Sequence, residues 1–154
     1  MVVQLCSTRM ESHVTRVDVL TFMRCHSRAV QASISAVSAP QAAVVGFIVT
    51  DDFEVVFDTV DTTRKVANLR RNPRCAFVIG GLVNGDERTV QLEGIADEPR
   101  GTDLDHLKEL YFIRFPDGRD RQHWPGLTYI RVRPQWLRFS DFNQSPAVIT
   151  EFTF

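Results

Sequence analysis

The chain has 154 residues, of which 44% are hydrophobic and 24% are charged, as in ordinary globular proteins. This length predicts one domain, residues 1–154, with a full hydrophobic core. The formal net charge of -1 argues against a protein that binds nucleic acid through bulk electrostatics. No apolar run is long enough to span a membrane, and the apolar run at the N-terminus is too short for a signal peptide.

The cysteines and histidines do not form a recognisable pattern. Cys6, Cys25 and Cys75 are odd in number and widely separated, so we expect no disulfide framework and a cytoplasmic protein. The four histidines show no ligand spacing with cysteine or carboxylate, which predicts no metal site; they are His13, His26, His106 and His123. Nucleophile elbows, Gly-rich dinucleotide loops and Walker motifs are also missing from the sequence, so an enzyme of this sequence would depend on a cofactor.

The first half of the chain predicts a helix and then three strands. Residues 1–12 show no periodic pattern and are expected to be loose. Apolar residues at helical spacing predict a helix over 13–25, with Ser12 as its cap; they are Val14, Val17, Leu20 and Met23. Strands are predicted over 29–37, 42–50 and 53–59, with a turn at 38–40. Apolar residues on both faces of the second strand indicate cover on both sides.

A candidate anion site follows the third strand, where a short helix is predicted over residues 66–71. Asp61 is a suitable N-cap for it, which places Arg64 and Lys65 in the first turn, where the helix dipole disfavours cations. Two cations, free amides and three hydroxyls suit a bound phosphate; the hydroxyls belong to Thr59, Thr62 and Thr63. The alternative is a solvated helix start, with the cations offset by Asp58 and Asp61.

The second half predicts a hairpin, a helix and further strands. Strands over 74–80 and 88–96 flank an Asn84-Gly85 turn, and the second of them alternates, with Val90 and Leu92 facing a core. Gly94 marks a bulge or a close backbone approach. A helix is predicted over 103–114, capped by Thr102, with a buried stripe of Leu104, Leu107, Leu110 and Tyr111. A loop over 115–125 follows, and then strands over 127–133 and 135–139 around Pro134. The tail over 141–154 is mixed, and its apolar residues need burial.

Six or seven strands with mostly short connections and three helices do not match the regular alternation of a parallel sheet. They predict a mainly β fold, an antiparallel barrel with helices closing its ends. Thr89 and Gln91 would share the polar face of their strand. Such residues are solvated by default, but in a groove an amide suits hydrogen bonding to the edge of a heteroaromatic ring.

Three segments together resemble the pyridoxamine 5′-phosphate oxidase-like, FMN-binding split barrels. They are Val56-Phe57-Asp58-Thr59 with Thr63-Arg64-Lys65, then residues 68–78, which read NLRRNPRCAFV, and then residues 90–96, which read VQLEGIA. The resemblance covers about residues 14–140, nearly the whole chain. It implies an antiparallel split β-barrel, a homodimer, and an FMN held non-covalently in a groove between two barrels.

The resemblance also assigns roles to individual residues. It makes Thr59, Thr63, Arg64 and Lys65 the phosphate clamp. It places Val44, Val45 and Gly46 beside the isoalloxazine ring, Thr89 and Gln91 near the flavin, and Trp136 and Arg138 at the pocket.

The sequence departs from the authentic oxidase at its substrate residues. Ala43 and Ile48 stand where that enzyme has basic residues, and residues 136–141 contain no histidine to match its Arg-x-His motif. The resemblance therefore implies a cytoplasmic flavoprotein oxidoreductase acting on another small substrate, without a catalytic residue that we can name. A deazaflavin-dependent reductase and a non-catalytic flavin-binding dimer remain alternatives.

Overall fold

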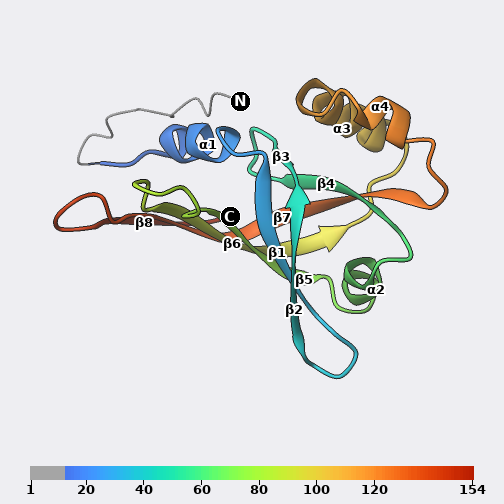
Figure 1. Cartoon of the computed structure of the whole chain (residues 1–154), viewed down its shortest axis with the longest axis horizontal. Helices are drawn as coiled ribbons and strands as arrows, with labels where there is room; N and C mark the ends of the chain where they lie inside the picture. Colours follow the sequence, from blue (N-terminus) through green and yellow to red (C-terminus); the bar gives the residue numbers. More distant parts are fainter. Residues whose placement is uncertain (1–12) are drawn as a thin grey trace.

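The computed structural model describes residues 13–154, so the predictions for residues 1–12 lie outside the described part. Within it, eight strands form one antiparallel sheet in the order β2-β1-β5-β6-β7-β4-β3, with β8 paired to β7. The sheet curls into a half-barrel, with α1 over one end and α3 and α4 over the other (Figure 1). The prediction of an antiparallel split barrel is confirmed. The strands are β1 (Arg28–Ile34), β2 (Pro40–Gly46), β3 (Ile48–Val49), β4 (Val55–Val60), β5 (Arg74–Gly80), β6 (Arg88–Asp97), β7 (Leu127–Asp141) and β8 (Val148–Thr153); the helices are α1 (Arg16–Arg24), α2 (Arg64–Arg71), α3 (Gly101–Arg114) and α4 (Gly118–Arg121).

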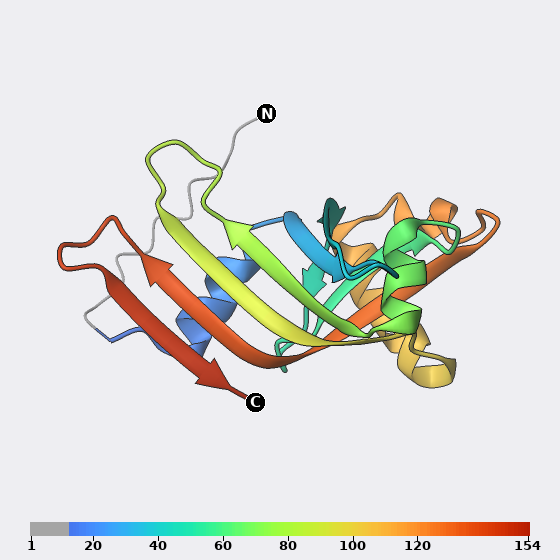
Figure 2. The same ribbon diagram turned by 90° about the horizontal axis from the view of Figure 1, so that it is seen from below.

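The long strand β7 joins the two halves of the sheet, pairing with β6 along one edge and with β4 and then β8 along the other. The view from below shows β5, β6, β7 and β8 running side by side (Figure 2). The prediction of two separate strands around Pro134 is wrong, because Pro134 lies opposite Gly94 where the β6 register shifts and stays within one continuous strand. A Cβ on Gly94 would lie 2.3 Å from the carbonyl oxygen of Arg133, so both the bulge and the close approach are confirmed.

The hydrophobic core lies between the sheet and α1. Val90 and Leu92 are fully buried, as the alternation of their strand predicts. From α1, the ring of Phe22 packs edge-on against Phe139 at 5.4 Å. The apolar positions predicted for the first helix are partly wrong, because Val17 is 73% exposed and Phe22 is buried instead.

Four further predictions need correction. The N-cap of α1 is Thr15, which forms a reciprocal capping box with Asp18. The helix α3 begins at Gly101, so Thr102 is inside it and does not cap it. The predicted loop over 115–125 contains the short helix α4, and Cys25 takes part in a disulfide, contrary to expectation.

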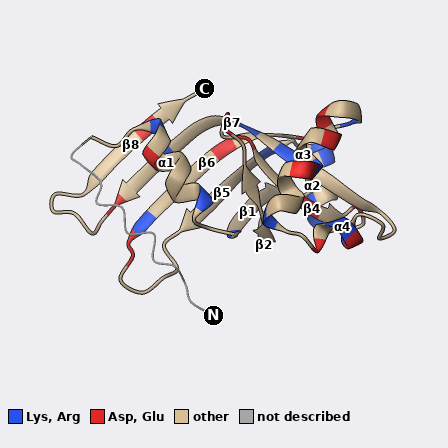
Figure 3. Ribbon diagram, turned by 90° about the horizontal axis from the view of Figure 1, so that it is seen from above, with Lys and Arg blue, Asp and Glu red and all other residues tan. Residues whose placement is uncertain are grey.

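The predicted strand over residues 42–50 is divided by Phe47 into β2 and β3. Within residues 13–154 the predicted cover on both sides is not found, because Val44 is 67% exposed. The mixed tail forms β8, and Val148 and Phe152 pack against the core. Charged segments of both signs gather around α2, α3 and α4, whereas β2 carries no charged residue (Figure 3).

Candidate functional site

The predicted phosphate clamp lies between the end of β4 and the start of α2. Thr63 is the N-cap of α2, so the prediction of Asp61 as the cap is wrong. Instead, the backbone N–H of Asp61 donates to the carbonyl oxygen of Gly126 at 2.8 Å, and its carboxylate lies against that glycine. Asp61 therefore ties this loop to the segment before β7 and leaves the start of the helix open.

Hydroxyls and cations come together at this helix start. The Oγ1 atoms of Thr59 and Thr63 are 3.3 Å apart. Arg64 and Lys65 are the first two residues of α2, and the first turn contains no acidic residue. Within residues 13–154, neither cationic side chain forms an ion pair or a hydrogen bond. Two uncompensated cations at the positive end of a helix are unfavourable unless an anion binds there.

A cavity of about 710 Å³ lies between this helix start and the β1–β2 hairpin. Among the described residues, its lining contains two cations and no acidic side chain. It consists of Gln31, Ser33, Ala39, Pro40, Gln41, Ala42, Ala43, Thr62, Thr63, Arg64 and Lys65. Thr59 supports Thr63 from behind and does not line the cavity.

The buried side chain of Asn68 holds α2 against the hairpin. Its Nδ2 atom donates to Ser33 Oγ at 3.0 Å and to Gln41 Oε1 at 2.8 Å. The sequence contained one signal for this contact, a polar residue beside the apolar Leu69 on a short amphipathic helix. Asn68 is thus hydrogen-bonded to two residues that line the cavity, Ser33 and Gln41, without lining it itself.

The other predicted site residues lie mostly on the outer face of the sheet. One row of paired residues crosses five strands and contains Val44, Val30, Val78, Gln91 and Arg138 in that order. The next row passes from Ala42 through Ala32, Ala76 and Glu93 to Trp136. The structure therefore brings Gln91 and Arg138 together as direct neighbours.

The remaining predicted residues occupy different surroundings. Thr89 pairs with Gly80 and Ser140, one step along the outer face from Gln91. Val45 is buried in the core, so only its backbone is available to a ligand. Gly46 lies beside the guanidinium of Arg28. The predicted residues thus form two groups, and β2 connects them because it lines the cavity at Gln41 and carries Val44 on the outer face.

Arg138 has unused hydrogen-bonding capacity on that face. Its Nε atom is buried and has no hydrogen-bond partner within residues 13–154, and Oε1 of Glu151 is 3.9 Å away. The indole N–H of Trp136 donates to the other oxygen of Glu151 at 3.4 Å. Glu151 lies on β8, which the sequence did not reveal as a strand.

Asp58, the residue before Thr59, anchors the same end of β4. Its carboxylate accepts hydrogen bonds from Tyr111 at 2.8 Å and from Arg121 at 3.1 Å. It is therefore engaged with α3 and α4, and it does not offset the cations of α2 as the alternative sequence interpretation assumed. Tyr129 is the β7 partner of Asp58, and burial raises the pKa of its phenol to about 12.

Residues 13–154 contain no group of three or more histidine, cysteine or acidic side chains arranged to hold a metal ion. None of the helices in that range is both long and apolar enough to cross a bilayer.

Comparison with known proteins identifies the family. The family model described as pyridoxamine 5′-phosphate oxidase matches residues 18–141. No match was found among curated proteins.

Solved structures share the fold at low sequence identity. A heme binding protein from Mycobacterium smegmatis has a TM-score of 0.75 and 15% identity over 96% of this chain and 60% of that one. A protein of unknown function from Agrobacterium tumefaciens has a TM-score of 0.67 and 18% identity over 73% of this chain and 50% of that one. This chain therefore spans only about half to three fifths of the length of these two structures.

A pyridoxamine 5′-phosphate oxidase-related, FMN binding protein from Nostoc punctiforme has a TM-score of 0.64 and 10% identity, covering 83% of this chain and 87% of that one. At such identities the solved structures establish the shared fold, whereas the family model covers most of the sequence itself. The chain therefore belongs to the pyridoxamine 5′-phosphate oxidase family.

Proposed function

We propose that this chain is a flavoprotein that binds FMN, with the phosphate of the cofactor at the start of α2. The observation that carries the proposal is the pair Arg64 and Lys65, which line a cavity without any acidic partner. A phosphate monoester has the opposite charge and several acceptor oxygens, which suit two cations, a Thr63 hydroxyl and the first-turn amides. The family match and the FMN binding protein from Nostoc punctiforme support the same ligand.

The flavin ring would extend from this cavity along β2, past Val44 and Gly46, toward the outer face of the sheet. Val44 is 67% and Val78 is 44% exposed on that face, and Val30 lies between them in the same row. A contiguous exposed apolar patch of this kind is typical of an interaction surface. We infer that a second copy of the chain covers it and that each flavin lies between two barrels. Gln91 and Arg138 would then be hydrogen-bond donors at the edge of the ring, with Thr89 and Trp136 beside them.

The chemistry proposed is the passage of hydride or electrons to or from an unidentified small substrate, and bound FMN would supply it. The part of this chain is to bind the phosphate through Arg64 and Lys65, to orient the ring along β2, and to exclude water at the covered face. Because Ala43 and Ile48 replace basic residues of the oxidase, we do not expect pyridoxamine phosphate to be the substrate.

Two alternatives use the same phosphate clamp. One is a reductase that uses a deazaflavin, whose phosphate would occupy the same position. The other is a flavin-binding dimer without turnover, which the missing substrate residues favour. Stopped-flow reduction of the bound flavin by nicotinamide nucleotides tests for the dimer without turnover. In such a protein no kinetic phase of flavin reduction becomes faster when a substrate is added.

The direct test is thermal unfolding of the purified full-length chain with and without FMN. Ligand at a hundred times its dissociation constant should stabilise the fold by about 2.7 kcal/mol. Parallel titrations with a deazaflavin and with hemin establish selectivity. An unchanged melting temperature with FMN, together with the absence of flavin from the purified protein, would reject the proposal.

A further inference from the structure

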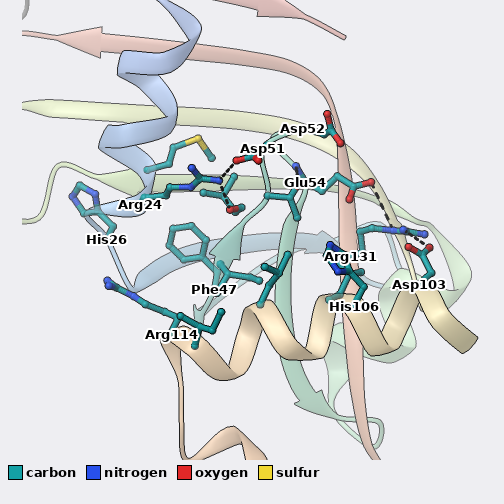
Figure 4. Close-up of a pocket in the computed structure, with 17 residues that line it drawn as sticks. Arg24, His26, Phe47, Asp51, Asp52, Glu54, Asp103, His106, Arg114 and Arg131 are labelled. Carbon is teal, nitrogen blue, oxygen red and sulfur yellow. Dashed lines mark hydrogen bonds and ion pairs between the residues drawn. The ribbon is translucent and has the colours of Figure 1, made fainter.

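A second cavity of about 740 Å³ lies away from the clamp (Figure 4). Three elements enclose it: the end of α1, the β3–β4 hairpin and one face of α3. None of its lining residues lines the cavity at the start of α2. The proposed FMN site therefore leaves this groove unused.

The middle of the groove is apolar. Phe47 is buried there, between the hairpin and the helix, and Ile48 lies next to it. From α3, Leu107, Leu110 and Ile113 line the groove at helical spacing. The helix rises about 1.5 Å per residue, so an apolar stretch of roughly 10 Å runs from Leu107 to the end of α3.

Most of the charged residues around the groove already have partners. Arg131 bonds to Asp97 and to Asp103, each at 2.6 Å. Arg24 bonds to Asp51 at 2.6 Å. The pair Arg24 and Asp51 lies on the hairpin side, and the pair Arg131 and Asp103 lies at the far end of α3 (Figure 4). They offer little net charge to a ligand.

Arg114 differs from these residues. It is exposed at the end of α3, lines the groove, and forms no ion pair or hydrogen bond with any residue in 13–154. His26 lies at the same end of the groove (Figure 4). The Nδ1 atom of His26 is 2.9 Å from the carbonyl oxygen of Phe22, so Nδ1 carries a proton and Nε2 remains for another contact. The free acid Asp52 lies across the groove on the hairpin and leaves this end cationic.

We propose that this groove binds a medium-chain carboxylic acid in its ionised form. The carboxylate would pair with Arg114 at the open end, beside His26. The chain would lie along Ile113, Leu110 and Phe47 as far as Leu107, where it displaces water from apolar surface. An elongated apolar stretch with one unpaired cation at its end matches a linear amphiphile with one negative charge.

The test uses the full-length chain and the fluorescent fatty acid dansylaminoundecanoate. Its emission should rise saturably on binding, and decanoate should displace it much better than decanol does. Arg114→Gln should weaken probe binding about five- to tenfold, a modest factor because the guanidinium is at the open rim. Leu110→Glu should abolish binding, because it places a negative charge in the apolar stretch.

Arg119→Gln is the matched control, because Arg119 is an exposed arginine nearby that pairs with Glu109 and does not line the groove. It should bind the probe as the wild type does, and all three variants should keep the wild-type melting temperature and FMN affinity. Equal probe affinity in Arg114→Gln and Arg119→Gln, or equal displacement by decanol and decanoate, would overturn the proposal. Because FMN binding is measured separately, failure here is distinct from failure of the flavin assignment.

Discussion

The hydroxyl of Tyr111 on α3 donates a 2.8 Å hydrogen bond to the carboxylate of Asp58 on β4. Its neighbour Tyr129 is also buried, but the hydroxyl of Tyr129 has no hydrogen-bond partner among residues 13–154. Two buried phenols next to β4 therefore differ in whether the hydroxyl forms a hydrogen bond. The first of them fixes the helical end of the barrel to the strand that carries Thr59.

That difference predicts unequal costs for two matched substitutions. Tyr111→Phe should lower the free energy of unfolding by about 1.5–3 kcal/mol, because a bond to a charged group is lost. Tyr129→Phe should change it little, since no bond is removed. Urea unfolding of both variants measures the difference, and equal losses would contradict the network.

The clamp predicts a specific loss of cofactor affinity. Arg64→Ala and Lys65→Ala should each weaken FMN binding by about 1.5–3 kcal/mol, with little change in the melting temperature. Arg70→Ala is the control, because Arg70 is a cation of the same helix that pairs with Glu98 outside the cavity. Quenching of flavin fluorescence gives the dissociation constants. If all three variants bind FMN like the wild type, the clamp lies elsewhere.

The outer face of the sheet predicts a dimer that can be dissociated without unfolding the chain. Val44→Glu and Val78→Glu place a charge on that exposed apolar face, where burial against a second copy would be costly. Sedimentation velocity should show monomers for both variants. Val37→Glu, at an 84% exposed position in the β1–β2 turn, should remain dimeric. If the wild-type chain sediments as a monomer, the proposed dimer through the outer face of the sheet is wrong.

Gly94 predicts a steric cost that depends on what surrounds it. In Gly94→Ala the new methyl group meets the backbone oxygen of Arg133 at 2.3 Å, so β6 or β7 must shift, at about 1–3 kcal/mol. In Gly46→Ala the nearest atom, at 2.7 Å, is the Nη1 atom of Arg28, the far end of a flexible side chain. Thermal unfolding should therefore show the larger loss for Gly94→Ala. The reverse order would show that the bulge is more adaptable than its geometry indicates.

The pair Asp86 and Arg88 predicts a pH dependence of stability. The hydrogen bond from Arg88 holds the pKa of the Asp86 carboxyl below its ordinary value of about 3.9. A depressed pKa in the folded state gives stability that is complete above the unfolded pKa and is lost as the pH falls through the folded pKa. The advantage of the wild type over Asp86→Asn should thus be constant near pH 7 and shrink below about pH 5. Urea unfolding across that range measures it, and a constant difference down to pH 2 would contradict the assignment.

The sequence by itself determined the elements that local patterns encode. The alternation around Val90 and Leu92 predicted β6 and its buried face. The helix predicted over residues 66–71 is present, and α2 ends at Arg71 as expected. Gly94 predicted a bulge or a close backbone approach, because a glycine inside an alternating strand often marks one of the two, and both occur. These features depend on residues close in the chain, so one sequence is enough to reveal them.

Only the tertiary structure decided the contacts between distant segments. Asp58 meets Tyr111 across 53 positions, and Asn68 meets Ser33 across 35, so no local pattern could show either pair. The continuity of β7 past Pro134 depended on a bulge in another strand, β6. The tail forms the strand β8 because it pairs with the free edge of β7. Local periodicity selects helix or strand, whereas the pairing of side chains across the fold depends on where the curled sheet places them.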